Sequence, residues 1–223
     1  MLEERGHKFV RYADDCNICV KSLRAAKRVM EGSIKFLEGK LKLKVNRKKS
    51  ATGSPTSLKF LGFSLYKNKE GTRIRVYEKP LNRLKNRLKL LTSRKRGGKM
   101  EWILKDVTRL MDGWLGYYSI ADMKTYVQRI SEWLRRRIRQ IYWKLWKRVR
   151  TRFENLIELK IPRGRAWEWA NSRKGYWRIA GSWILATTIT NSYLDAIGFP
   201  NMLKRYEELR ARVMRHGMLH DTC

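Results

Sequence analysis

The sequence predicts an α+β protein that is rich in strands at its start and helical over the rest. Short stretches of alternating apolar and polar residues before residue 78 are typical of half-buried strands. After residue 79, apolar residues recur every three or four positions, which indicates amphipathic helices. We therefore expect a small sheet with one helix over residues 1–78, a helical bundle over 79–155, and a small basic, aromatic helical extension with a frayed tail over 156–223.

The first predicted element is a β-hairpin with two carboxylates at its tip. Strand-like residues run from Phe9 to Tyr12 and resume at Ile18, and Asp14 and Asp15 lie between them. Adjacent carboxylates repel each other unless cations compensate, and Mg²⁺ ions do so where nucleotidyl transfer takes place. The alternative is an ordinary solvated turn, because Asp side chains hydrogen-bond to their own nearby backbone.

A helix and further strands are expected after the hairpin. Ser22 is a suitable N-cap and Gly39 a suitable end for a helix with an apolar stripe. Gly62 lies inside a later apolar run and indicates a bulge or a close approach of the backbone. Strands are expected over residues 41–46, 58–66 and 73–77.

The helical part begins at Pro80, a residue that suits a helix start. Residues 93–99 form a basic loop that is broken by glycines. The aromatic run 113–118 is expected to end the second helix in a turn. Helices are expected over residues 80–91, 101–111, 123–152 and 202–216, with an aromatic, arginine-rich segment over 161–198.

The net charge narrows the choice of partner. The chain has 223 residues with 52 Lys and Arg against 20 Asp and Glu, which gives a formal charge of +32. A charge of this size repels itself unless a polyanion neutralises it, and nucleic acid is the leading candidate. A membrane is not expected, because no run reaches the ~18 apolar residues of a spanning helix. The start does not read as a signal peptide, since charged residues continue into the first strand.

Basic residues interleaved with aromatic ones are the candidate contacts to nucleic acid. The helix expected over 123–152 carries more cations than acidic residues can pair, with Trp143 and Trp146 among them. Aromatic rings among cations suit base stacking, but an aromatic core with arginines stacked on it fits equally well. The candidate nucleic-acid-binding residues are Arg83, Arg87, Arg94, Lys95, Arg96, Arg135, Arg136, Arg139, Lys144, Lys147, Arg173, Lys174 and Arg178.

Cys16 and Cys19 have CxxC spacing, yet no second pair of Cys or His follows to complete a zinc site. We interpret them as reduced thiols, buried or at the edge of the second strand, in a reducing compartment. A Cys/His endonuclease cluster is also missing after residue 160, so DNA cleavage is not predicted.

The order of these motifs resembles the reverse transcriptases encoded by bacterial group II introns, over roughly residues 3–207. The hairpin motif and the blocks that follow it resemble the second half of the family's palm domain. The aromatic run before the arginine-rich helix resembles the thumb (maturase, or X) domain, and a later block resembles the C-terminal extension. The blocks are Tyr12-Ala13-Asp14-Asp15, Asn46…Lys49-Ser50, Phe60-Leu61-Gly62-Phe63, Gly113-Trp114-Leu115-Gly116-Tyr117-Tyr118 and residues 166–180.

The resemblance implies RNA-directed DNA synthesis with two Mg²⁺ ions, and intron RNA binding that serves splicing and mobility in the bacterial cytoplasm. In the family, the aspartate at the position of Asp14 binds both metals, and the neighbour matching Asp15 supports the site. Lys49 matches a lysine near the phosphates of the incoming nucleotide, and the thumb lies along the template–primer duplex. The implied substrate-binding residues are Tyr12, Ala13, Asn46, Lys49, Phe60, Leu61 and Gly62.

The chain also departs from the family pattern. The family's site needs another Asp from a strand well before the hairpin, and only Met1 to Lys8 precede the strand here. One hairpin cannot hold two metals with two adjacent carboxylates whose side chains point to opposite faces. We therefore expect a chain that does not polymerise alone, whether its gene is truncated, interrupted, incompletely annotated or split, with a separate N-terminal fragment as a candidate partner.

Two other interpretations remain. In the first, the chain is a stand-alone RNA-binding maturase fragment without polymerase activity. In the second, it is a remnant that folds poorly because its sheet edge is exposed.

Overall fold

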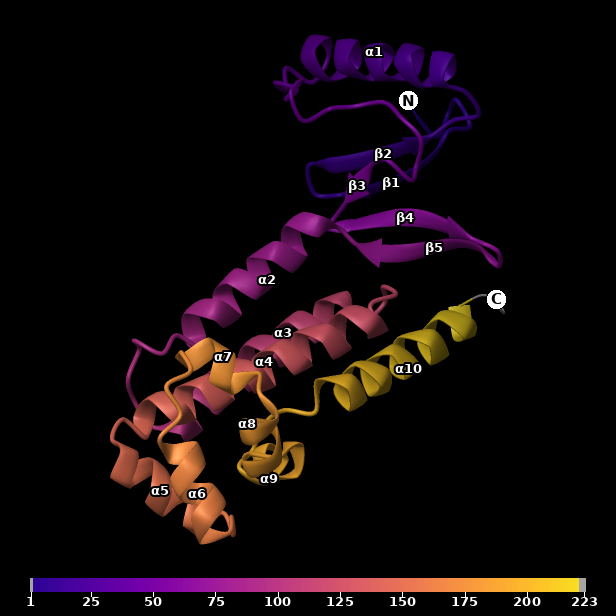
Figure 1. Ribbon diagram of the computed structural model, residues 1–223. Helices are drawn as coiled ribbons and strands as arrows, with labels where there is room; N and C mark the ends of the chain where they lie inside the picture. The colour runs from indigo at the N-terminus through magenta and orange to yellow at the C-terminus, as the bar shows by residue number, and fades with distance from the viewer. Residues whose placement is uncertain (1, 221–223) are drawn as a thin grey trace. The chain divides into compact units, whose positions relative to one another are not determined.

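The computed structural model describes residues 2–220, with side chains as far as Arg215. The chain divides into two units, one ending at Pro80 and one beginning at Leu81, close to the boundary expected after residue 78. The division lies in the first turn of helix α2 (Glu78–Leu91), and the elements of both units are labelled in Figure 1. Of the expected C-terminal tail, residues 221–223 lie outside the described residues.

The first unit begins with the predicted hairpin, which is confirmed. Strands β1 (Lys8–Tyr12) and β2 (Asp15–Cys19) pair antiparallel with Tyr12 opposite Asp15, so Ala13 and Asp14 form a two-residue turn. Ala13 has φ 50°, a left-handed conformation that residues with a Cβ rarely adopt. Positive φ at the first turn residue matches the right-handed twist of hairpin strands. Asp14 therefore occupies the turn, and Asp15 begins the second strand.

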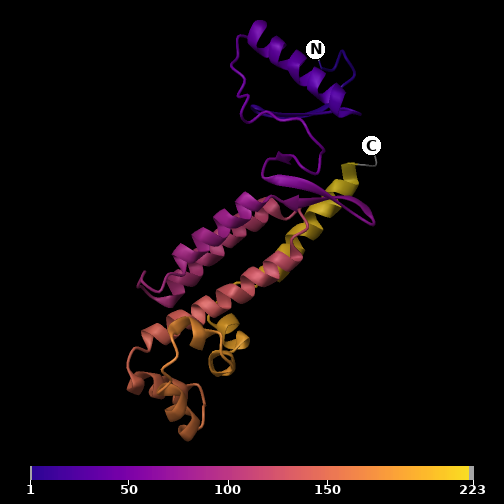
Figure 2. The same cartoon turned by 45° about the horizontal axis from the view of Figure 1, so that its top comes forward.

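The helix after the hairpin also matches the expectation. Helix α1 (Leu23–Gly39) ends at the expected glycine, and the Oγ of its N-cap Ser22 accepts a hydrogen bond from the N–H of Ala25 at 3.2 Å. That bond satisfies one of the free donors of the first turn. In both views α1 lies alongside the β1–β2 hairpin (Figure 1 and Figure 2).

The strand predicted over residues 41–46 is wrong, because this segment is irregular. Lys42 has φ 56°, which interrupts an extended conformation, and Leu41 and Leu43 are both exposed. Within the described residues no strand pairs with the segment. The alternation of apolar and polar residues was real, but a strand also needs a partner to satisfy its backbone.

The single strand predicted over residues 58–66 is a hairpin instead. Strands β3 (Lys59–Phe60) and β4 (Phe63–Asn68) pair with Phe60 opposite Phe63, and Leu61 (φ 50°) and Gly62 (φ 83°) form the turn. Two consecutive positive φ values are what a type I′ turn requires, which is the physical role of Gly62. Strand β5 (Gly71–Val76) then pairs with β4, as predicted, in a three-stranded sheet of order β3-β4-β5.

The second unit is helical. Its core consists of fully buried side chains that include Leu88, Val107, Leu134, Ile138 and Leu185. Helix α7 packs on α4, α6 packs on α5, and α10 packs along α3 and α4 (Figure 2). After α2, the helices are α3 (Met100–Tyr118), α4 (Lys124–Leu145), α5 (Val149–Glu158), α6 (Arg163–Ala170), α7 (Tyr176–Ala180), α8 (Trp183–Thr188), α9 (Asn191–Ala196) and α10 (Met202–His220).

The turn predicted over residues 113–118 is wrong, because α3 continues through both of its glycines to Tyr118. A glycine inside a helix costs about 1 kcal/mol relative to alanine. Leu115 lies between Gly113 and Gly116, and its side chain is buried, so that the apolar stripe of α3 continues past the expected end. Burial of a leucine contributes about 1.5–3 kcal/mol, which offsets the cost of the two glycines.

The single helix predicted over residues 123–152 is also wrong, since α4 ends at Leu145 and α5 begins at Val149. In one continuous helix, Leu145 and Val149 would continue the apolar stripe at helical spacing, yet both are exposed. The structure instead buries Trp143 and Trp146, which the sequence placed among the charges; they are 1% and 7% exposed. Because the two indoles bury more apolar surface than the two aliphatic side chains, breaking the helix here is favourable.

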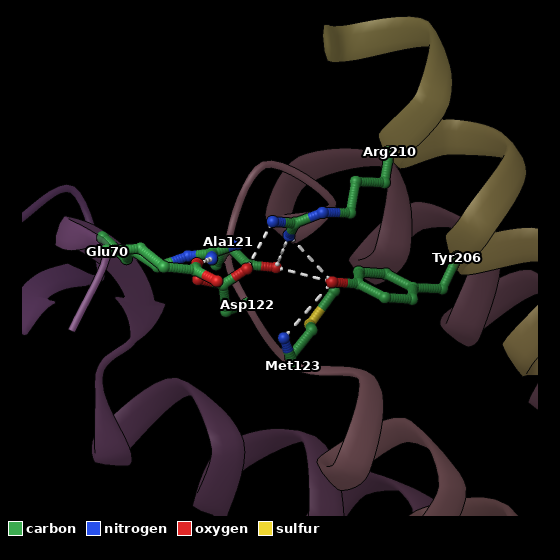
Figure 3. A network of polar contacts seen from close by, with 7 residues as sticks. Glu70, Ala121, Asp122, Met123, Tyr206 and Arg210 are labelled. Carbon is green, nitrogen blue, oxygen red and sulfur yellow. Dashed lines mark hydrogen bonds and ion pairs between the residues drawn. The ribbon is translucent and has the colours of Figure 1, made fainter. Parts of the chain in front are cut away.

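Helix α10 is fixed to the connection between α3 and α4 by a polar network (Figure 3). The hydroxyl of Tyr206 donates to the carbonyl oxygen of Ala121 at 2.9 Å. The same hydroxyl accepts a hydrogen bond from the N–H of Met123 at 3.3 Å. Arg210 donates to the same carbonyl at 2.7 Å and forms an ion pair with Asp122. The C-terminal segment is thereby part of the unit that begins at Leu81, and no separate unit begins at residue 156.

Replacing Tyr206 by phenylalanine is expected to lower the free energy of unfolding by about 1–3 kcal/mol, because the buried N–H of Met123 loses its acceptor. Tyr206 is only 2% exposed, so water does not readily replace the hydroxyl. Urea denaturation followed by circular dichroism measures the change. The matched control is Tyr176→Phe, whose hydroxyl makes no hydrogen bond within the described residues, and an equal loss in both variants would contradict the prediction.

Candidate nucleic-acid interface

Both carboxylates at the hairpin tip are exposed. Asp14 occupies the turn and Asp15 is the first residue of β2, while Arg11 braces the turn by donating from Nε to the carbonyl of Ala13 at 2.9 Å. Within the described residues no three Asp, Glu, His or Cys side chains gather as a metal centre would require. Two carboxylates therefore do not by themselves fit a two-metal centre, since each Mg²⁺ takes about six oxygen ligands.

The two thiols on β2 are free and exposed. Partial burial raises the pKa of the Cys16 thiol, which keeps it protonated at neutral pH. Both thiols are exposed on β2 and neither is buried, while their reduced state in a reducing compartment stays a prediction. Cys223 lies outside the described residues.

The other residues that the family resemblance implies for substrate binding lie in turns of the first unit. Asn46 organises one turn, because its Oδ1 accepts from the N–H of Lys49 at 3.3 Å and its carbonyl accepts from Ser50 at 3.1 Å. The side chain of Lys49 is exposed beyond that turn. Residues 60–63 form the β3–β4 hairpin, and Tyr12 and Ala13 end β1 and begin its turn.

Arginines on α4 point toward the rest of the helical unit. Arg135 is 15% exposed in its side chain and pairs with Asp195 at 2.9 Å. Arg139 donates to the carbonyl of Ile189 at 2.8 Å and to Oδ1 of Asn191 at 2.9 Å. Burial lowers the pKa of Arg139, as does the nearby charge of Arg135. These two candidates for nucleic-acid binding use their guanidinium donors to hold α8 and α9 on α4.

Arg136 is enclosed in the same way. Its guanidinium lies 3.9 Å from the ring centroid of Trp177 and donates to the carbonyl of that residue at 2.8 Å. The guanidinium also lies against Gly181, where a Cβ would come within 2.4 Å of the guanidinium carbon. A side chain at position 181 would therefore displace Arg136, which explains a glycine here.

Two further structural arginines were missed in the sequence. Arg137 donates to the hydroxyl and the carbonyl of Thr92 at 2.5 and 2.8 Å and so ties the end of α2 to α4. Arg152 stacks on Trp143 at 4.5 Å from the ring centroid and donates to the carbonyl of Trp146 at 2.9 Å. The available signal was the proximity of tryptophans, since Trp133 also lies under Arg137.

The remaining candidate cations divide between internal contacts and exposed positions. Lys144 is used internally, donating to the carbonyl of Arg94 at 2.5 Å, and Arg94 lies over the ring of Tyr176. Arg96 is paired with Asp106. By contrast, seven of the candidate nucleic-acid-binding residues are exposed and make neither an ion pair nor a ring contact within residues 2–215, and we call them the exposed cation set. It consists of Arg83, Arg87, Lys95, Lys147, Arg173, Lys174 and Arg178.

The aromatic residues of the C-terminal segment divide between core and surface. Trp169 is buried, and the exposed Trp183 lies edge-on to it with the ring centroids 5.0 Å apart. Trp167 is 59% exposed and makes a similar edge contact with Phe153 at 5.8 Å. The segment therefore contains a small aromatic core with exposed rings above it, and base stacking on those rings stays a prediction.

Comparison with known families supports one part of this picture. Residues 81–157 match the family model described as "Group II intron, maturase-specific domain". The matched segment begins with the helical unit and ends in α5. No curated protein sequence matches the chain. The match indicates a maturase-related role in group II intron splicing and confirms that part of the resemblance, whereas the similarity to a reverse transcriptase palm stays a prediction.

Within residues 2–220, none of the helices is both long enough and apolar enough to cross a bilayer.

Proposed function

We propose that this chain binds group II intron RNA through its helical unit and promotes splicing of that RNA. The observation that carries the proposal is the location of exposed cations on the segment that matches the maturase-specific domain. Arg83, Arg87, Lys95 and Lys147 all lie within residues 81–157 and have no acidic partner among the described residues. Such cations bind phosphates without reading sequence, which positions a folded RNA.

The arrangement of the remaining arginines supports this division of labour. Arg135, Arg136 and Arg139 make bonds inside the unit, so they set the shape of the scaffold on which the exposed cation set is presented. A rigid, positively charged helical surface suits structured RNA, because RNA helices are recognised mainly through shape and backbone.

The proposal is tested by adding the full chain to group II intron RNAs and measuring binding and the rate of splicing. For the intron that the protein serves, we expect binding and faster splicing. For a structured RNA of equal length that is not an intron, we expect weaker binding. The matched variant carries Arg83→Gln, Arg87→Gln and Lys95→Gln, which should fold normally because these side chains make no ion pairs. Unchanged splicing of every intron at saturating protein would overturn the proposal.

Replacing Asp14 by alanine is expected to leave the affinity for intron RNA within about twofold of the wild-type value. Asp14 lies in the turn of the first unit and is exposed, so its loss removes a surface charge and no scaffold contact. Filter binding at constant salt measures the effect. A tenfold weaker affinity would place the hairpin tip inside the RNA interface.

We infer a second, conditional role for the hairpin in RNA-directed DNA synthesis. The support is the turn that presents Asp14, with its strained Ala13, in a unit that also carries the exposed Lys49. Because Asp14 and Asp15 do not fit a two-metal centre alone, this role requires carboxylates from a second polypeptide, such as an N-terminal reverse transcriptase fragment. The helical unit would then lie along the template–primer duplex.

Primer extension on an RNA template with Mg²⁺ separates this role from RNA binding. The isolated chain is expected to show none, and the complemented protein is expected to lose the activity when Asp14 is replaced by alanine. Extension by the isolated chain would contradict the requirement for further carboxylates.

A further inference from the structure

A cavity of about 230 Å³ opens in the basic loop between α2 and α3. Trp102 forms part of its lining and is 60% exposed, which is unusual for so large an apolar side chain. Ile103 behind it is buried and gives the cavity an apolar base. The remaining lining residues are Arg96, Gly97, Gly98 and Lys99.

Two consecutive glycines keep the wall facing the indole free of side chains. Gly97 and Gly98 have φ values of 70° and 91°, in the left-handed region that favours glycine. A Cβ at Gly98 would lie 3.7 Å from Cε3 of Trp102, so the loop backbone runs beside the six-membered ring. The loop and the ring together form a slot that is open to solvent and partly apolar.

Two cations, Arg96 and Lys99, line this slot, and Arg96 is fixed in place. Arg96 donates to the carbonyl of Leu91 at 3.2 Å and to a carboxylate oxygen of Asp106 at 2.5 Å. The hydrogen bond from Arg96 lowers the pKa of Asp106, so the pair stays charged at neutral pH. Because Arg96 is held there, it does not stack on Trp102. The side chains of Lys95 and Lys99 are exposed beside the slot.

We propose that this slot binds one unpaired base of the RNA, stacked on Trp102, with the adjoining phosphates near Lys95 and Lys99. The inference rests on the proposed RNA binding and names the part of the RNA that this loop takes. A base inside a duplex is stacked on both faces and cannot enter, so the ligand is a bulged, looped or single-stranded nucleotide. Stacking on an aromatic ring is tolerant of sequence, because every base has a π face.

Other exposed features of the unit lack this combination. Trp167 is as exposed as Trp102, but its ring contacts Phe153 edge-on and lines neither of the two described cavities. The larger cavity, of about 550 Å³ along α3, is lined by Glu101 and Asp112 as well as by Lys105 and Arg109, so its charges balance, and its lining contains no aromatic ring on which a base could stack. Of these two cavities in the described part of the chain, the one beside Trp102 is the one that joins an exposed indole, a glycine backbone wall and an exposed lysine, Lys99.

The test compares two labelled probes that bind the full chain, a short single-stranded oligo(A) and the same sugar–phosphate chain without bases. Trp102→Ala is expected to weaken oligo(A) binding on the order of tenfold and to leave the abasic probe unchanged. Trp102→Phe is expected to retain most of the affinity, because a smaller aromatic ring still stacks. Trp167→Ala is the matched control and is expected to change oligo(A) binding by less than about twofold.

Photocross-linking locates the contact independently of affinity. An oligonucleotide that contains 4-thiouridine is expected to cross-link to the tryptic peptide Met100–Lys105, in which Trp102 is the aromatic residue. Equal loss of both probes in Trp102→Ala, or cross-links that avoid this peptide, would overturn the inference while RNA binding stands. Failure of the wild-type chain to bind any RNA would overturn the proposed function and this inference with it.

Discussion

Replacing Trp143 by alanine is expected to lower the free energy of unfolding of the helical unit by about 3–5 kcal/mol. The indole is 1% exposed, so the substitution leaves a cavity that the surrounding helices cannot fill. It also removes the surface on which Arg152 stacks, 4.5 Å from the ring centroid, and the edge contact with Trp146 at 6.2 Å. Arg152 would then remain partly buried without its aromatic partner.

Urea denaturation followed by far-UV circular dichroism measures this effect, and Trp167→Ala provides the comparison. Trp167 is 59% exposed, so its replacement is expected to cost about 1 kcal/mol or less. Equal costs for the two variants would mean that Trp143 lies on the surface among the charges, as the sequence pattern indicated.

The affinity for intron RNA is expected to fall by about 10³–10⁵ between 50 and 200 mM salt, the range for six to ten phosphate contacts. Each exposed cation that contacts a phosphate releases a counterion, so the plot of log affinity against log salt has a slope of about −0.7 to −0.9 per contact. The triple variant Arg83→Gln, Arg87→Gln, Lys95→Gln is expected to make that slope less negative by roughly two to three.

The contrasting variant is Arg139→Gln, which removes one charge of the same sign from α4. Because Arg139 donates to Ile189 and Asn191 inside the unit, this variant is expected to lower stability and to leave the salt slope unchanged. Equal changes in slope for Arg139→Gln and for single exposed-cation variants would contradict the distinction between scaffold and exposed arginines.

Sequence patterns within a few residues of each other were sufficient to predict elements that depend on neighbouring residues alone. The β1–β2 hairpin and α1 followed from strand alternation, a short polar turn and the Ser22 cap, and the structure has all of them. Leu61 falls inside the strand predicted from the apolar run 58–66, yet it adopts positive φ and forms a turn with Gly62. The extension of α3 and the break after α4 depend on burial of Leu115 and Trp143, which no local pattern contains.

The candidate site shows the same limit. A stripe of arginines on a predicted helix indicated a solvent-facing binding surface, and charge counting supported it. The sequence could not show that the carbonyls of Trp177 and Ile189 lie within reach of Arg136 and Arg139, because these contacts join residues far apart in the chain. The exposed cations on α2 were predicted and are exposed, since one face of α2 is buried and the other is polar.

The bonds that assemble the helical unit have a consequence for sequence divergence. Arg136, Arg139 and Arg152 each donate to a main-chain carbonyl, a group that every amino acid supplies. A substitution at residue 177 or 189 therefore keeps the acceptor, within the limits set by the ring contact of Trp177 and the burial of Ile189, whereas the donor must remain arginine. Across homologues we expect the arginines of α4 and α5 to vary slowly while the segment that they hold drifts, so that this segment diverges in sequence faster than in shape.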